Sequence, residues 1–212
     1  MSVRARREQE KAQRRADILD AAEHVFFDKG FERSTMDDIA RAASLSRGLL
    51  YVYFRDKSAI LAAVMLRAGE HLRQRFQEVA ALPINGAEKI QAMGLAYYRF
   101  SQEEPRYFDL LTRAASDWLQ GEGHIEDEAL EHCSTEVMEI MADTLRRGIA
   151  DGSLSSEQVR DPFQTALFLR GALHGVIMLT RQEAGRDIPD EDTSHALVAY
   201  TMDRLRASLL AH

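Results

Sequence analysis

The residues whose types and spacing could bind another molecule lie in the run TMDDIARAASLSRGLLYVYFRDK, residues 35–57. The apolar spacing in this run predicts a helix of about nine residues, a tight turn at Ser44–Leu45 and a second short helix capped by Ser46. Thr35 just before the first helix, with Asp38 three residues later, is close to a capping box. On the second helix, Leu50 and Phe54 are four residues apart and would both face a core. Two helices joined in this way outline a helix-turn-helix, whose second helix can enter the major groove of DNA.

The opposite face of that second helix carries side chains suited to DNA contacts. Arg47 can donate two hydrogen bonds to guanine O6 and N7, Gly48 lets the backbone approach closely, and Val52 lies on the same face. The groups that can reach phosphate oxygens are the side chains of Tyr51, Tyr53 and Lys57 and the hydroxyl or amide of Thr35. Because the same spacing also occurs in ordinary α-helical cores, spacing alone leaves both interpretations open.

The residue identities around this pattern are more specific than its spacing. The runs Thr35–Ala40, Ala43–Gly48 and Leu50–Lys57, with the run from Ala16 through Gly30–Phe31 before them, closely resemble the N-terminal domain of the tetracycline-repressor (TetR) family of bacterial regulators. The resemblance implies contacts to base edges from Arg47, Gly48, Leu49 and Val52. It implies contacts to the phosphate backbone from Thr35, Tyr51, Tyr53 and Lys57.

Three residues depart from the family pattern. Ser44 stands where the family usually has glycine, which costs strain if the turn needs a positive φ. Leu49 replaces a frequent threonine and removes a hydroxyl donor. Val52 replaces a frequent aromatic residue; it can meet a thymine methyl group but cannot hydrogen-bond. The base preference at these last two positions is therefore left open, whereas the fold is predicted.

Helical apolar spacing continues along nearly the whole chain, without convincing strand-like alternation. The expected fold class is all-α, with an N-terminal three-helix helix-turn-helix DNA-binding domain and a C-terminal helical ligand-binding and dimerisation domain. We place the first domain, with its N-terminal arm, at residues 1–57 and the second at residues 58–212. After a fourth helix capped by Asp56, the expected helices cover residues 87–103, 106–119, 125–150, 160–184 and 191–210.

Charge is distributed unevenly between the two parts. The whole chain has 27 basic and 34 acidic residues and a net charge of −7, whereas residues 1–57 carry a net charge of +2. The basic residues that precede Ala16 are Arg4, Arg6, Arg7, Lys11, Arg14 and Arg15. This arm could contact DNA, or it could be a frayed helix start or a disordered tail, and charge alone does not separate these alternatives.

Residues 58–212 contain no diagnostic motif, but the resemblance implies that they hold a small-molecule site and a dimer interface. The segment 163–178 is apolar on more than one face; with the final helix it could form a four-helix bundle between two chains, or pack in the core of one. The pocket candidates are Met93, Tyr97, Phe100, Tyr107, Phe108, Leu111, Trp118, Met138, Met141, Phe168, His174 and Met178. Amid apolar neighbours, His174 fits a core residue better than a metal ligand.

Other function classes find little support. Without a glycine-rich phosphate loop or a nucleophile elbow, no enzyme activity is expected. The single cysteine, Cys133, is interpreted as a buried apolar residue, with a redox sensor as the alternative. We expect no cofactor and no metal, and we interpret one histidine-acid cluster as a solvated helix start; its members are His124, Glu126, Glu128 and His132. Neither a membrane-length apolar run nor a secretory signal stands out, so a cytoplasmic protein without a membrane partner is expected.

With the resemblance, these features imply a homodimeric, ligand-responsive transcriptional regulator. As a repressor, it would bind a pseudo-palindromic double-stranded DNA operator and be released by a small apolar or amphipathic effector. Two alternatives stay open: an activator on the same fold, and a small-molecule sensor or carrier whose DNA-binding domain is inactive. Arg47, Tyr53 and Lys57 speak against the inactive domain.

Overall fold

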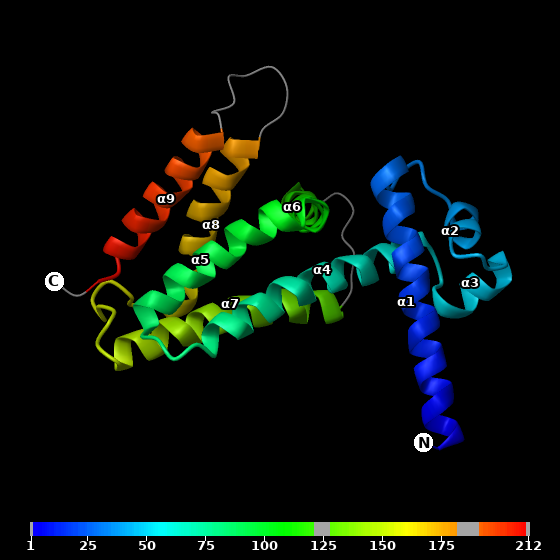
Figure 1. The fold of residues 1–212 in the computed structure, drawn as a ribbon, viewed down its shortest axis with the longest axis horizontal. Helices are drawn as coiled ribbons and strands as arrows, with labels where there is room; N and C mark the ends of the chain where they lie inside the picture. Colours follow the sequence, from blue (N-terminus) through cyan, green and yellow to red (C-terminus); the bar gives the residue numbers. More distant parts are fainter. Residues whose placement is uncertain (1, 121–127, 182–190, 211–212) are drawn as a thin grey trace. The chain divides into compact units, whose positions relative to one another are not determined.

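The computed structural model describes residues 2–120, 128–181 and 191–210, and for residues 113–120 and 191 it describes the backbone alone. Over these ranges the chain is built from α-helices and contains no strand, which confirms the all-α fold class (Figure 1). The helices are α1 (Val3–Lys29), α2 (Met36–Ala42), α3 (Arg47–Tyr53), α4 (Lys57–Ala80), α5 (Gly86–Glu103), α6 (Pro105–Gln120), α7 (Glu128–Ala150), α8 (Pro162–Arg181) and α9 (Glu191–Ala207). The longer helices lie close to their predicted ranges.

Side-chain caps fix several of the helix starts. The Ser46 hydroxyl accepts a hydrogen bond from the Leu49 N–H at 3.3 Å, and Asp56 Oδ1 accepts one from the Ala59 N–H at 2.8 Å. Both caps confirm the sequence prediction. Helix α1 is longer than its apolar stripe, because Ser2 caps it and the basic arm forms its first turns. The alternative of an unstructured tail is therefore wrong for this arm.

The chain divides into two compact units. The first contains Met1–Ala68 with Asp109–Leu130, and the second contains Gly69–Phe108 with Glu131–His212. Helix α4 belongs to both units, because the boundary between them falls within it, between Ala68 and Gly69. The functional boundary expected after residue 57 stays a prediction.

The core of the first unit lies between α1, α2, α3 and the first turns of α4. Its buried side chains include Ile18, Leu19, Ala22, Val25, Phe26, Ile39, Ala40, Leu50, Phe54, Ile60 and Val64. Arg67 ties α4 to α1, because its Nη1 lies 2.6 Å from Asp20 Oδ1 and 2.9 Å from Glu23 Oε1. Burial of these apolar side chains is the main force that holds α3 in place.

In the second unit, α5 packs against α8 and α9, which also pack against each other (Figure 1). Fully buried side chains in this unit include Met93, Phe100, Phe108, Leu145, Ile177 and Val198. The start of α5 approaches α7 through two glycines: a Cβ at Gly86 would lie 2.2 Å from the Cα of Gly148. No larger residue fits at that crossing.

Helix α8 is long and apolar enough, by length and composition alone, to cross a membrane, and the qualifying window is only 22% buried. No such segment is expected from the sequence, because the apolar run of α8 is interrupted by charged residues. An apolar helix that packs on its neighbours or on a second chain meets the same measure, so this property does not assign α8 to a membrane.

Candidate nucleic-acid interface and small-molecule cavity

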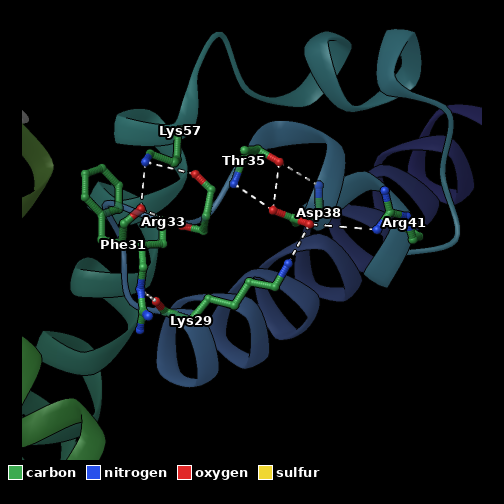
Figure 2. A network of polar contacts seen from close by, with 8 residues as sticks. Lys29, Phe31, Arg33, Thr35, Asp38, Arg41 and Lys57 are labelled. Atoms are coloured by element: carbon green, nitrogen blue, oxygen red, sulfur yellow. Dashed lines mark hydrogen bonds and ion pairs between the residues drawn. The ribbon is translucent and has the colours of Figure 1, made fainter.

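The start of α2 is fixed by a capping box that the sequence predicted. Thr35 Oγ1 accepts a hydrogen bond from the Asp38 N–H at 3.1 Å, and Asp38 Oδ2 accepts one from the Thr35 N–H at 3.1 Å. Lys29 Nζ donates to Asp38 Oδ1 at 2.7 Å and so ties the end of α1 to α2 (Figure 2). Hydrogen bonds from Lys29 and Thr35 lower the pKa of Asp38 to about 2, so the carboxylate is ionised at neutral pH.

The turn between α2 and α3 depends on a strained serine. Ser44 has a φ of 57°, the only positive φ of a non-glycine residue among the described residues. The Leu45 N–H donates to the Ala40 oxygen at 2.8 Å and the Ser44 N–H donates to the Arg41 oxygen at 3.1 Å, which closes the turn. A side chain in this left-handed region costs about 1–2 kcal/mol. The condition set by the sequence analysis is therefore met, and the position that resembles a family glycine carries strain.

Helix α3 has one buried and one exposed face, as its spacing predicted. Leu50 and Phe54 are 0% and 4% exposed and anchor it in the first unit. The exposed residues of α3 are Arg47, Gly48, Leu49, Tyr51 and Val52. Val52 is apolar yet 74% exposed, so this face remains open in the free chain. Tyr53 is half-buried.

The Arg47 guanidinium is already oriented on the exposed face of α3. Its Nη1 lies 3.2 Å from Asp37 Oδ2, and its Nη2 donates to the Tyr51 hydroxyl at 3.4 Å. The guanidinium carbon also lies 5.6 Å from the centre of the Tyr51 ring. The Arg47 pKa is raised by the hydrogen bond to Tyr51 and the charge of Asp37, which keeps the side chain cationic. Orientation before binding reduces the entropy that a base contact would cost.

Lys57 lies in a cage of backbone carbonyl groups. Its Nζ donates to the oxygens of Phe31 at 2.6 Å, Ser34 at 3.0 Å and Glu32 at 3.4 Å, and lies 4.1 Å from the centre of the Phe31 ring (Figure 2). These bonds use all the protons of the ammonium group. In the free chain Lys57 thus braces the connection between α1 and α2 from the first residue of α4, and its phosphate contact stays a prediction.

The Thr35 hydroxyl is also occupied, because it donates to Asp38 Oδ2 at 2.8 Å within the capping box. In the basic arm, the Arg15 guanidinium lies 4.9 Å from the centre of the Phe54 ring, so one arm residue packs beside the end of α3. Arg6 pairs with Glu10 at 2.9 Å along the helix surface. DNA contacts from this arm stay a prediction.

The second unit contains a largely apolar cavity between its helices. The cavity, with the space at its opening, has an empty volume of about 590 Å³. It is lined by Leu72, Phe76, Ile90, Gln91, Met93, Gly94, Tyr97, Val137, Met141, Leu169, Arg170, Leu173, Met202, Leu205 and Arg206. Small-molecule sites in proteins have this mainly apolar make-up.

Three of the predicted pocket residues line this cavity: Met93, Tyr97 and Met141. The buried Phe100, Phe108 and Met138 lie in the core of the unit without lining it, and the half-buried Tyr107, Leu111 and Met178 do not line it either. Phe168 faces outward and is 58% exposed, which is the opposite of its predicted placement. The side chain of Trp118 lies outside the described residues. Effector contacts from the cavity residues stay a prediction.

His174 joins the cavity through Tyr97. The Tyr97 hydroxyl and His174 Nδ1 are 2.8 Å apart and hydrogen-bonded. Burial raises the Tyr97 pKa, partly opposed by Arg170, while burial and the charge of Arg170 lower the His174 pKa. Tyr97 and His174 are therefore both neutral at pH 7. Their pairing supports the interpretation of His174 as a satisfied core residue.

Sequence reasoning missed the two cationic lining residues, Arg170 and Arg206. The pocket prediction was limited to aromatic, aliphatic and histidine side chains. The signal for Arg170 in the sequence is a single charged residue inside the apolar run of α8.

The described residues contain no group of three or more His, Cys, Asp or Glu side chains that could hold a metal ion. Of the histidine-acid cluster, His124 and Glu126 lie outside the described residues. Cys133 is 2% exposed, and burial raises its pKa to about 11. The thiol is therefore protonated at neutral pH, which favours the interpretation as a buried apolar residue over a reactive one.

We predict that Ser44→Gly raises the free energy of unfolding by about 0.5–1 kcal/mol, because glycine adopts a positive φ without a Cβ clash but adds entropy to the unfolded chain. Ser58→Gly, in the first turn of α4, is the matched control and should lower stability, since it places glycine in an ordinary helix. Urea unfolding followed by circular dichroism measures both. Equal shifts for the two variants would contradict strain at Ser44.

We predict that Lys57→Met lowers the free energy of unfolding by about 2 kcal/mol, because it removes charge-assisted hydrogen bonds and leaves partly buried carbonyl groups unpaired. Lys29→Met is the control; it breaks an ion pair in which the lysine side chain is 51% exposed, and should cost less than about 1 kcal/mol. Unchanged stability of Lys57→Met, together with weaker binding to every DNA sequence, would restore the phosphate role and overturn the bracing role.

Comparison with protein families gives two matches along the chain. Residues 18–64 match the model described as bacterial regulatory proteins, tetR family. Residues 90–205, more than half of the chain, match the tetracyclin repressor-like C-terminal domain. The two matches cover the helix-turn-helix and most of the second unit.

Individual relatives are similar over most of their length. The transcriptional regulator TtgR of Pseudomonas putida is 26% identical over 165 residues, which is 72% of this chain and 76% of TtgR. The transcriptional repressor KstR2 of Rhodococcus jostii is 24% identical over 147 residues, 69% of this chain and 71% of KstR2.

Solved structures show the same fold. A TetR/AcrR-family regulator from Thermobifida fusca is 25% identical, with a TM-score of 0.69 over 92% of this chain and 97% of its own. SmeT, the repressor of the Stenotrophomonas maltophilia multidrug efflux pump SmeDEF, is 22% identical, with a TM-score of 0.69 over 93% and 90%. With the helix-turn-helix geometry and both family matches, these likenesses give one conclusion: the chain belongs to the TetR family, whose members are DNA-binding transcriptional regulators and not enzymes.

Proposed function

We propose that this TetR-family regulator is a homodimeric repressor, which binds a pseudo-palindromic DNA operator in the cytoplasm and leaves it when a small apolar or amphipathic molecule occupies the cavity. The two-sided α3 carries the proposal: Leu50 and Phe54 anchor the helix, and its outer face is open. Such a helix fits a major groove roughly 12 Å wide. We assign base-edge contacts to Arg47, Gly48, Leu49 and Val52, and phosphate contacts to Thr35, Tyr51 and Tyr53.

The outer surface of α8 and α9 supports a dimer. Large apolar side chains on these two helices are left exposed in the single chain: Leu167, Phe168, Leu179, Leu197 and Tyr200, at 37–64% exposure. An apolar surface of this kind is covered in a stable protein, and a twofold axis covers it with the same surface of a second chain. A twofold dimer would present two α3 helices to two half-sites of a palindrome.

Helix α4 connects the two activities in this proposal. It begins at Lys57, after α3, and carries Leu72 and Phe76 into the lining of the cavity. A ligand that shifts α4 would change the separation of the two α3 helices in the dimer. It can release DNA only if it binds the released state more tightly than the DNA-bound state, because a ligand with equal affinity for both shifts nothing.

An activator on the same fold remains the second candidate. The observation that favours it is a partial likeness to the transcriptional activator FasR of Mycolicibacterium smegmatis, 27% identical over 99 residues, or 47% of this chain and 45% of FasR. TtgR and KstR2 are similar over a larger share of the chain, and KstR2 is a repressor. We therefore place repression first.

We predict that Arg47→Ala weakens binding to the preferred operator by about 1–3 kcal/mol and relaxes base preference at one position of each half-site, because it removes a bidentate guanine contact. Arg55→Ala is the matched control: it removes an exposed charge just after α3, where no base contact is assigned. Its effect should be equal across DNA sequences. Fluorescence anisotropy with the operator and its single-base variants measures both; unchanged base preference in Arg47→Ala contradicts the assigned contact.

Selection of binding sites from a random duplex-DNA pool by the purified protein tests the proposed function as a whole. We expect a palindrome whose half-sites are about one helical turn or more apart. Placed upstream of a reporter, that site should lower expression in the presence of the regulator, whereas a rise would identify the activator. A folded dimer that enriches no DNA sequence would overturn the proposal in favour of a sensor with an inactive DNA-binding domain.

A further inference from the structure

We propose that the cavity of the second unit takes an amphipathic organic anion, whose carboxylate pairs with Arg170 while its hydrocarbon part lies on the apolar lining. The claim that this anion is the effector rests on the proposed function. The claim that the cavity binds such an anion can be tested without DNA.

The charged side chains that line the cavity are all positive, which favours an anionic ligand. Arg170 and Arg206 are the charged groups of the lining, which includes no aspartate or glutamate among the described residues. Arg206 is exposed and donates to Gln91 Oε1 at 3.1 Å, so it holds a positive charge at the rim. Two positive charges with no negative one attract an anionic ligand and repel a cationic one.

Arg170 differs from three other arginines of its unit, Arg73, Arg75 and Arg146. Each of these three pairs with glutamate or aspartate side chains. Within the described part of the chain, Arg170 has no carboxylate partner; its Nη1 donates to the Met138 sulfur at 3.5 Å, and the guanidinium also hydrogen-bonds to the Tyr97 side chain, which lowers the Tyr97 pKa against the effect of burial. A thioether is a weak acceptor, so most of the guanidinium donors remain available. A half-buried guanidinium that faces a cavity without a counter-ion is a site for a carboxylate, which it can bind through two parallel hydrogen bonds.

Neighbouring polar groups fit the same ligand. The Tyr97 hydroxyl lies beside Arg170 and is hydrogen-bonded to His174, and both groups are neutral at pH 7. They can therefore hydrogen-bond near the head group without cancelling the charge of Arg170. The rest of the lining includes Leu72, Phe76, Ile90, Val137 and Leu173, which offer a hydrocarbon chain only apolar contacts.

Three probes with the same ten-carbon chain test the charge of the ligand: decanoate and decyltrimethylammonium, each below its micellar concentration, and decan-1-ol below its solubility limit. Isothermal titration calorimetry of the full-length protein gives their dissociation constants. We expect decanoate to bind at least about tenfold more tightly than decan-1-ol, because a charge-assisted hydrogen bond contributes that much, and the cation to bind most weakly. Equal affinities for decanoate and decan-1-ol, or no binding of any probe, would overturn the inference.

Arg170→Gln tests the residue that makes the difference. It should weaken decanoate about tenfold and leave decan-1-ol within about twofold, so retained alcohol binding shows that the variant cavity is intact. Arg99→Gln, an exposed arginine of α5 that does not line the cavity, is the matched control and should leave both ligands unchanged. If Arg170→Gln binds decanoate as tightly as the unmodified protein does, Arg170 is not the head-group site.

Failure of this inference is distinguishable from failure of the proposed function. If DNA selection yields a palindrome while decanoate fails to bind, the regulator stands and the effector class is wrong. If decanoate binds through Arg170 while no DNA is enriched, the cavity assignment stands and the proposed regulatory role fails. If both hold, decanoate should lower operator affinity, and Arg170→Gln should need about tenfold more decanoate for the same effect.

Discussion

The position of α2 and of α3, the proposed DNA-binding helix, depends on how the connection between α1 and α2 is held. Lys57 donates three hydrogen bonds to the carbonyl oxygens of Phe31, Glu32 and Ser34, and its ammonium group lies over the Phe31 ring. A loop of this kind exposes carbonyl groups that no helix can satisfy, and a single ammonium group satisfies them together. Because Lys57 also begins α4, the same contact fixes the helix that leads to the second unit.

The buried face of α3 holds the helix in the first unit, whereas its exposed face makes no contribution to the core. Ionic contacts of Asp38 with Lys29, and burial of Leu50, set the position of α2 and α3 before any DNA is present. The exposed face is then free to carry residues that do not help the fold, such as the apolar and open Val52. The tight turn between α2 and α3 holds Ser44 at a positive φ, so the position of α3 is obtained at a cost in stability.

The cavity differs from this interface, because its apolar lining surrounds the Arg170 charge, which no carboxylate among the described residues neutralises. Desolvation of a guanidinium is costly without a counter-ion, and Arg170 is half-buried; the proposed anionic ligand would offset this cost. Burial, together with the same charge, lowers the pKa of His174, whereas the pKa of Tyr97 is raised by burial and Arg170 partly opposes that rise.

The sequence by itself determined the helices, the caps at Thr35, Ser46 and Asp56, and the two faces of α3, because these depend on spacing and on residues a few positions apart. The tertiary structure alone decided what Lys57 and Arg170 contact. Their partners lie more than twenty residues away along the chain, and no local pattern distinguishes a lysine in a carbonyl cage from one that faces a phosphate. The same limit explains why Phe168 was placed in the pocket: an aromatic residue in an apolar helix can face either way, and only the packing of α8 on its neighbours decides which face is covered.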